Sequence, residues 1–153
     1  MAVDKKATLT YVQLMKEDLA VFRLVPEDGV IPDYETGQFI TLGMPIPSED
    51  NKIIRRAYSI ASHPENKRFI ELVIRWVRKP LPGRVTTALF NAGEGNEVSW
   101  LPPTGAALQI NEKLADGSKD QRRIVCVSGG TGIAPFMAFA RHLHATGDHR
   151  QLI

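Results

Sequence analysis

An arginine, a tyrosine and a serine within residues 55–62 are the side chains of this sequence with the clearest chemistry. The segment has the composition of a β-strand, in which alternate side chains point to opposite faces. Arg56 and Tyr58 would therefore share one face, with Ser59 on the other. A guanidinium can bind a phosphate through paired hydrogen bonds, and a phenol ring can lie on an aromatic heterocycle. The pattern suits a dinucleotide held at both ends, although an ordinary strand with an exposed charge would have the same composition.

A second possible phosphate site begins at Gly83. The composition of residues 83–90 predicts a short helix that starts near this glycine. A helix N-terminus presents unpaired N–H groups and the positive end of a dipole, and Thr86 could add a hydroxyl. The segment therefore suits a pyrophosphate, but a capped helix that only packs on the end of a sheet is the alternative.

A third glycine-rich turn, residues 129–132, follows the apolar segment 122–128 and precedes a helical pattern. A continuous apolar strand, a glycine turn and a helix are typical of the opening βα unit of a doubly wound nucleotide-binding domain. The turn is not a full G-x-G-x-x-G motif, because Pro135 stands where the third glycine would be. The expected buried face of the helix consists of Ile133, Phe136, Met137, Ala140 and Leu143.

The elements that would position these groups are short strands. We expect them near residues 8–14, 19–25, 37–42, 55–62 and 69–77, followed by a strand that ends at Leu101 and a segment, 106–110, that completes the sheet. Strands at this spacing favour an antiparallel barrel over alternating strands and helices. The fold class is therefore mainly β, with a six-stranded antiparallel Greek-key barrel and one short helix.

Composition limits the kind of protein. The chain has 153 residues, 43% of them hydrophobic and 24% charged, which is typical of a globular protein with one domain of ordinary size. No apolar run approaches the about 18 residues of a membrane span, and the charged N-terminus is not a signal peptide, so we expect a cytoplasmic protein. The single cysteine, Cys126, cannot form an internal disulfide, and we expect a buried, inert thiol. The four histidines show no metal-ligand spacing, and we expect His142 and His144 to be solvated.

Basic residues are concentrated in the middle of the chain. Residues 52–84 carry nine lysines and arginines and only two acidic residues, whereas residues 1–51 carry four basic and nine acidic residues. The basic segment is compatible with a solvated strand surface, with phosphate binding, or with steering of an acidic partner. Nucleic acid is a less favoured partner, because no aromatic residues are interleaved at a stacking spacing.

Taken together, these motifs resemble the ferredoxin-NADP reductase family, in which an FAD-binding barrel is joined to an NAD(P)-binding domain. The form of the motifs is similar to that of bacterial ferredoxin or flavodoxin reductases, whereas the longer segment 75–84 resembles the reductase components of oxygenases. The matching pieces, in the order of the family, are Gly37-Gln38-Phe39, Arg56-Ala57-Tyr58-Ser59 with Ile60-Ala61-Ser62, Gly83 to Thr86, Gly95-Asn96-Glu97-Val98, Pro103-Thr104-Gly105 and residues 129–135.

The resemblance implies a role for each matched position. Arg56 would bind the FAD pyrophosphate, and Tyr58 would stack on the isoalloxazine ring while Ser59 hydrogen-bonds near flavin N5; these last two are the implied catalytic residues. The residues implied to bind FAD are Arg56, Ala57, Tyr58, Ser59, Val73, Ile74, Gly83, Arg84, Val85, Thr86 and Thr131. The residues implied to face the nicotinamide nucleotide are Gly130, Thr131 and Gly132.

The resemblance also implies a domain division and an activity. Residues 1–111 would form the FAD barrel, 112–121 a linker, and 122–153 the start of an NAD(P)-binding domain, completed by a further C-terminal segment or by another chain. The expected activity is electron transfer between NADPH or NADH and an acidic ferredoxin or flavodoxin. Alternatives are the reductase component of an oxygenase, a flavin-binding electron-transfer module without its own nicotinamide site, and a structural barrel that has lost its cofactor. We expect the 153-residue chain alone to be incomplete for NAD(P)H oxidation.

Overall fold

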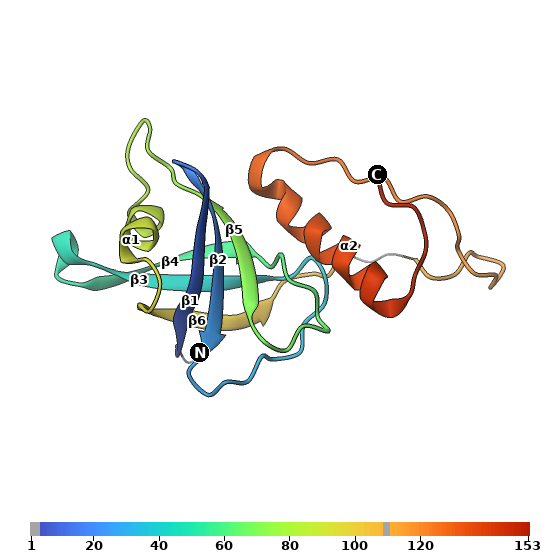
Figure 1. Cartoon of the computed structure of the whole chain (residues 1–153), viewed down its shortest axis with the longest axis horizontal. Helices are drawn as coiled ribbons and strands as arrows, with labels where there is room; N and C mark the ends of the chain where they lie inside the picture. The colour runs from blue at the N-terminus through green and yellow to red at the C-terminus, as the bar shows by residue number, and fades with distance from the viewer. Residues whose placement is uncertain (1–3, 109–110) are drawn as a thin grey trace.

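A computed structural model describes residues 4–108 and 111–153. Its centre is a six-stranded antiparallel sheet in the order β4-β3-β6-β1-β2-β5 (Figure 1), which confirms the expected barrel class. The strands are β1 (Lys5–Lys16), β2 (Leu19–Pro26), β3 (Phe39–Ile46), β4 (Lys52–Ser59), β5 (Ile70–Arg75) and β6 (Glu97–Thr104). The helical elements are the 3₁₀ turns η1 (Pro47–Glu49) and η2 (Gly130–Ile133), and the α-helices α1 (Arg84–Ala92) and α2 (Ala134–Thr146).

Alternation along the strands builds the core. In β2, the side chains of Ala20, Phe22 and Leu24 are fully buried, and the residues between them are half-buried. Trp100 of β6 is also buried at 1% exposure, and its indole donates a hydrogen bond to the Lys6 carbonyl of β1, 3.2 Å away. The period of two that is typical of a strand therefore fills the barrel.

The last strand differs from the expectation. Strand β6 ends at Thr104, and residues 105–108 are not part of the sheet, so the predicted strand over 106–110 is wrong where the structure describes it. Residues 109 and 110 lie outside the described residues. The sheet is complete without this segment because β6 already pairs with both β1 and β3.

The barrel is closed at a narrow seam between its two end strands. Strands β4 and β5 form no ladder with each other in the part of the chain that the structure describes. They are joined just beyond β4 by an isolated antiparallel bridge between Ile60 and Leu72. The Ala61 amide also donates a 2.8 Å hydrogen bond to the Glu71 carbonyl. We call this junction, with the facing edges of β4 and β5, the β4–β5 seam.

The two α-helices lie at opposite ends of the molecule. Helix α1 packs on one end of the barrel against β3 and β4, and its buried residues are Val85, Thr86 and Leu89. Helix α2 lies on the far side of the barrel from α1, as Figure 1 shows. Neither of these helices is long and apolar enough to cross a membrane, and the same holds for every other helix in the described residues.

The segment before the glycine turn is not the continuous buried strand that the sequence predicted. Ile124 forms one parallel bridge with Leu152, and the Cys126 amide donates to the Ile153 carbonyl at 2.7 Å. Val127 is 87% exposed, and Cys126 is half-buried instead of buried. Burial raises the pKa of the Cys126 thiol. A parallel strand becomes buried when other elements cover both of its faces, and residues 151–153 provide only one edge.

Helix α2 buries a different face from the one predicted. Its buried residues are Ala134, Ala138, Phe139 and Leu143. Of the predicted set only Leu143 is buried, while Ala140 is exposed and Ile133 is 46% exposed. The helical period was correct, but the helix packs on the barrel, and that contact determines which side is covered.

Candidate functional site

Tyr58 is the most informative residue of the β4–β5 seam. It lies opposite Ile40 in the β3–β4 ladder, and its half-buried ring packs against the hydrophobic core. Its hydroxyl is buried and has no hydrogen-bond partner among the described residues. Burial raises the pKa of Tyr58 to about 12, so the phenol stays neutral at physiological pH. An unpaired buried hydroxyl is costly, and a ligand that reached it would supply the missing hydrogen bond.

Arg56 lies two residues before Tyr58, on the same face of β4, and is exposed. One guanidinium nitrogen, Nη1, donates to the neighbouring Arg55 carbonyl at 2.8 Å. Arg55 itself forms an ion pair with Asp4, whereas Arg56 forms no ion pair with the residues that the structure describes. The geometry therefore leaves the positive charge of Arg56 available to an anion beside the seam.

The N-terminus of α1 begins at a position where only glycine fits without a shift of its neighbours. The N-cap is Gly83, no side chain caps the helix, and the first turn holds no acidic residue. A Cβ atom on Gly83 would come within 2.6 Å of the Thr86 hydroxyl. This hydroxyl donates to the Gly83 carbonyl at 3.0 Å and accepts from the Val77 amide at 3.4 Å. Thr86 thus holds the loop onto the helix, and its hydroxyl is engaged within the chain.

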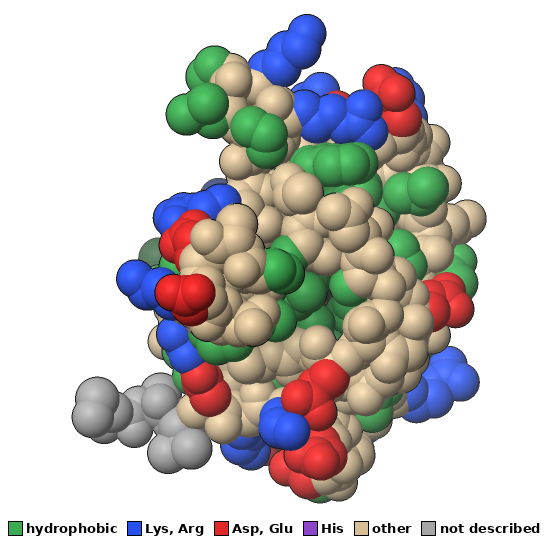
Figure 2. Space-filling model, turned by 90° about the vertical axis from the view of Figure 1, so that its left-hand side faces the viewer, with side chains coloured by type: hydrophobic (Ala, Val, Ile, Leu, Met, Phe, Trp, Pro, Cys, Tyr) green, Lys and Arg blue, Asp and Glu red, His purple; other side chains and the backbone are tan. Residues whose placement is uncertain are grey.

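The neighbours of Gly83 serve in different ways. Arg84 is turned toward η1, where its Nη1 lies 2.6 Å from the Glu49 carboxylate. Val85 is 2% exposed and belongs to the core, so only its backbone could reach a ligand. An apolar groove of about 450 Å³ also borders Arg84, on the α1 end of the barrel that Figure 2 shows. Its remaining wall is formed by the β3–η1 segment, with Met44, Pro45, Ile46 and Pro47.

The residues predicted on β5 and at the end of β4 line the seam mainly with backbone. Ile74 is 1% exposed, and Val73 is half-buried. Both pair with β2 on one edge of β5, and this leaves the other edge toward the seam. Ala57 is exposed and Ser59 is half-buried, immediately before the bridge at Ile60. The sequence thus placed Ala57, Ser59, Val73 and Ile74 correctly on the two strands that border the seam.

The glycine turn at residues 130–132 lies next to β5. It forms η2, which contacts β5, and Gly130 has a φ of +56°, a conformation that favours glycine. A side chain on Gly129 or Gly130 would meet no atom within 4 Å. The Thr131 carbonyl accepts the hydrogen bond of the Ala134 amide that starts α2. The backbone of this turn is therefore open to a ligand. The turn lies against β5, which is one of the two strands that border the seam.

These features fit a bound FAD. The unpaired Tyr58 hydroxyl requires a partner that the described chain does not provide. Arg56 offers an uncommitted positive charge, and the uncapped α1 terminus offers N–H groups. Tyr58, Arg56 and the backbone at Gly83 would together hold such a group across the seam.

The interface between the barrel and α2 was not predicted from the sequence. Arg141 of α2 donates to Glu71 of β5, and His142 donates from Nδ1 to Glu65 at 2.7 Å. His63 also donates to Glu65, from its own Nδ1 at 2.9 Å. The prediction that His142 is a solvated helix residue is therefore wrong, because it is half-buried against the 63–66 turn. No local pattern signals these contacts, since the partners are far apart in the sequence.

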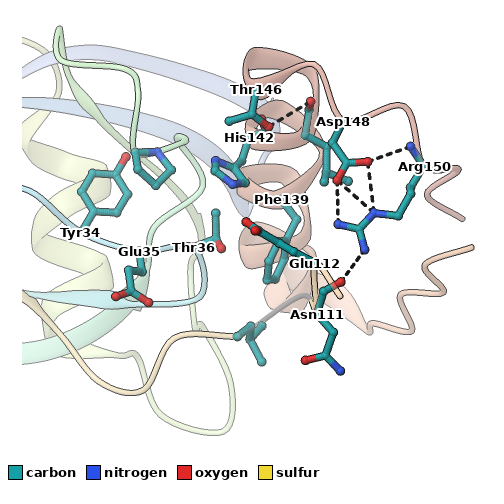
Figure 3. Close-up of a pocket in the computed structure, with 13 residues that line it drawn as sticks. Tyr34, Glu35, Thr36, Asn111, Glu112, Phe139, His142, Thr146, Asp148 and Arg150 are labelled. Atoms are coloured by element: carbon teal, nitrogen blue, oxygen red, sulfur yellow. Dashed lines mark hydrogen bonds and ion pairs between the residues drawn. The ribbon is translucent and has the colours of Figure 1, made fainter. Parts of the chain in front are cut away.

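A cavity of about 520 Å³ lies at this interface (Figure 3). Tyr34 and Thr36 line it from the barrel, and Phe139 and His142 line it from α2. Arg150, which is paired with Asp148 at 2.7 Å, lines its other end. None of the predicted cofactor residues lines this cavity, so it is separate from the seam.

Comparison with known proteins is consistent with this geometry. The family described as "Oxidoreductase FAD-binding domain" matches residues 6–108. A flavohemoprotein from Bordetella pertussis is 28% identical over 137 residues, which cover 88% of this chain and 32% of that protein. The reductase component of a propane 2-monooxygenase from Mycolicibacterium goodii is 28% identical over 149 residues, which cover 96% of this chain and 38% of the relative. The chain thus spans roughly a third of each of these two relatives.

The fold also has close counterparts among solved structures. The FAD/NAD-binding domain of a nitric oxide dioxygenase from Vibrio cholerae superimposes with a TM-score of 0.79 at 22% identity. The match covers 96% of this chain and 60% of that one. At this level of identity the likeness concerns the fold alone.

Proposed function

Because this chain belongs to the family of oxidoreductase FAD-binding domains, we propose that it binds FAD along the β4–β5 seam. In this proposal it moves electrons between NADPH or NADH and a ferredoxin or flavodoxin. The observation that supports it best is the buried, unpartnered hydroxyl of Tyr58, two residues from the uncommitted charge of Arg56. When bound, FAD would supply hydride exchange and one-electron transfer.

The residues of the chain supply binding and orientation. The Tyr58 ring would stack on the flavin while its hydroxyl donates a hydrogen bond, and Ser59 would reach the edge of the ring. Arg56 and the backbone N–H groups from Gly83 would neutralise the pyrophosphate. Arg84 would contribute a second charge only after its 2.6 Å ion pair with Glu49 opens.

The glycine turn would serve the nicotinamide side. Its open backbone at Gly130 allows a flat ring to approach closely. In this proposal Gly130, Thr131 and Gly132 hold the nicotinamide against the seam. The excess of basic residues over 52–84 would attract an acidic acceptor protein at a rate that falls with ionic strength.

A second candidate is the reductase component of an oxygenase. The loop between β5 and α1 favours it, because this segment resembles those reductases. In the loop, Arg78 stacks on Trp76 at 4.3 Å, and Leu81 is 78% exposed. The similarity to the propane 2-monooxygenase reductase component points the same way. Here the acceptor would be an iron–sulfur or oxygenase component in place of ferredoxin or flavodoxin.

Spectroscopy of the purified chain tests the proposal. The chain is mixed with FAD, freed of excess cofactor and scanned across the visible absorption bands of the flavin. The proposal expects a bound flavin with resolved bands, whereas a colourless protein would refute it. Anaerobic addition of NADPH or NADH, compared with photoreduction, then separates a reductase from a module without a nicotinamide site. Reduction by light but not by either nucleotide would favour the module.

A further inference from the structure

The carboxylate of Glu71 is buried at the point where the barrel closes. Its side chain is only 3% exposed, and its two oxygens each accept a hydrogen bond from a different arginine. Arg23 Nε lies 2.8 Å from Oε2, and Arg141 Nη1 lies 2.5 Å from Oε1. A buried carboxylate with two charge-assisted partners is held in one geometry.

The two arginines do not have the same role. Arg23 belongs to β2, and its guanidinium lies over the rings of Tyr11 and Phe69 at 4.6 and 4.3 Å. The barrel therefore balances the charge of Glu71 by itself. Arg141 comes from α2, so its bond to Glu71 adds a link between two parts of the molecule.

Arg141 contacts both sides of the β4–β5 seam. The same Nη1 atom that donates to Glu71 also donates to the Ala61 carbonyl at 2.8 Å. Ala61 and Glu71 are themselves joined by the backbone hydrogen bond that closes the seam. Ala61 follows Ser59 by two residues, and Glu71 precedes Val73 by two residues. Arg141 thus binds next to the strand ends that carry the candidate cofactor residues.

Other contacts of α2 do not reach these strand ends. Phe139 and Leu143 are buried at 4% and 5% exposure and face the cavity at the interface. His142 bonds to Glu65, which lies in the turn between β4 and β5. These contacts hold the helix on the barrel, but only Arg141, among the described residues of α2, is hydrogen-bonded to the seam itself.

The helix transmits the position of Arg141 to the glycine turn. Helix α2 begins at Ala134, directly after η2, so about 10 Å of helix at 1.5 Å per residue separates Arg141 from the turn. A rigid helix held at this point sets where Gly130 and Thr131 lie relative to Tyr58 and Ser59. We propose that Arg141 is a positioning residue that fixes the glycine turn against the flavin-binding seam, an inference that rests on the proposed function.

The experiment compares Arg141→Met and Arg141→Lys with a matched control, Arg75→Met. Arg75 lies on β5 and forms an exposed ion pair with Asp18 (Nε to Oδ2, 2.9 Å) but no bond to α2. The control substitution therefore removes an ion pair without changing the contacts of the helix. Each full-length 153-residue variant is measured for FAD affinity by titration, for amide hydrogen exchange by mass spectrometry, and for quenching of flavin fluorescence by iodide.

We expect Arg141→Met to speed exchange of the peptides covering residues 129–140 at least about ten-fold, the scale of one charge-assisted hydrogen bond. Iodide should then quench the flavin more strongly, because the turn no longer covers it. Amide exchange in β1 and β2 should change less than about two-fold. FAD affinity should also change less than about two-fold, because the β4–β5 seam that binds FAD belongs to the barrel. Arg141→Lys should restore part of the protection, and Arg75→Met should leave residues 129–140 unchanged.

The inference is overturned if the exchange of residues 129–140 and the quenching are unchanged in Arg141→Met while FAD still binds. It is also overturned if β1 and β2 lose protection equally, since Arg141 would then be a general stabilising residue. A wild-type chain that binds no FAD would instead refute the proposed function, and the exchange data would then report only on the docking of α2.

Discussion

Replacing Tyr58 by phenylalanine separates the chain's own stability from its affinity for FAD. The substitution keeps the ring and removes a buried hydroxyl that has no partner in the described structure. In the chain without cofactor, the hydroxyl is a cost, because an unsatisfied buried polar group loses its hydrogen bonds to water. In the complex with FAD, the same hydroxyl would gain a bond. The two effects of Tyr58→Phe should therefore have opposite signs.

The magnitudes follow from these two states. An unpaired buried hydroxyl costs about 1–3 kcal/mol, so Tyr58→Phe should raise the free energy of unfolding of the cofactor-free chain by up to about 1–2 kcal/mol. A neutral hydrogen bond in the complex contributes about 0.5–1.5 kcal/mol net relative to the unfolded chain. Because the gain in stability of the cofactor-free chain also weakens binding, FAD affinity should fall by the sum of the two effects, about 1.5–3.5 kcal/mol or roughly ten- to four-hundred-fold. The ring still stacks, and the absorption bands of the flavin should therefore change little.

Tyr34→Phe is the matched control. The Tyr34 hydroxyl is also buried, but it bonds to Ser62 Oγ at 3.0 Å and donates to the His63 carbonyl at 2.8 Å. Its removal should lower the free energy of unfolding by about 1–3 kcal/mol, because the partners are left unsatisfied. Urea unfolding of the cofactor-free variants and calorimetric titration with FAD give both quantities. A Tyr58→Phe chain that is less stable than wild type without cofactor, or that binds FAD equally well, would refute the reasoning.

Four further predictions test other parts of the structure. Arg56→Met should weaken FAD by about 1.5–3 kcal/mol if its guanidinium makes a charge-assisted bond to the pyrophosphate; equal affinity by calorimetry would remove that assignment. Leu72→Ala should lower the free energy of unfolding by about 2–5 kcal/mol, because Leu72 is fully buried at the bridge that closes the barrel; a loss below about 1 kcal/mol in urea would show that the site is not packed as described. Burial raises the pKa of Tyr34 to about 12, so the folded chain binds more protons than the unfolded chain between about pH 10 and 12. Stability should fall as pH rises through that window, by roughly 2–3 kcal/mol at 1.36 kcal/mol per pKa unit, and this part of the loss should be absent in Tyr34→Phe. Burial opposes ionisation of Glu65, but hydrogen bonds from His63, its own backbone and His142 outweigh it and lower the pKa of that carboxyl. Glu65→Gln should therefore cost stability near pH 6 and progressively less as the pH falls below about 4, the range in which a free glutamate becomes protonated; a constant difference across pH would contradict this contact.

The sequence determined the parts of this protein that depend on local pattern. An apolar run over residues 19–25 predicted β2, and composition predicted the helix after Gly83, because residue type and backbone conformation are local properties. The ordered motifs also identified the family, which the match over residues 6–108 supports. Arg56, Tyr58 and Ser59 were placed on one strand for the same reason.

Only the tertiary structure decided which surfaces meet. The helical period over 134–146 did not reveal that α2 would turn Phe139 and Arg141 toward the barrel. The burial of Glu71 between Arg23 and Arg141 joins residues 48 and 70 positions apart, and no local signal carries such a pairing. The same holds for the Tyr58 hydroxyl, since a strand pattern assigns a face, while the neighbouring strands decide whether a polar atom on that face finds a partner.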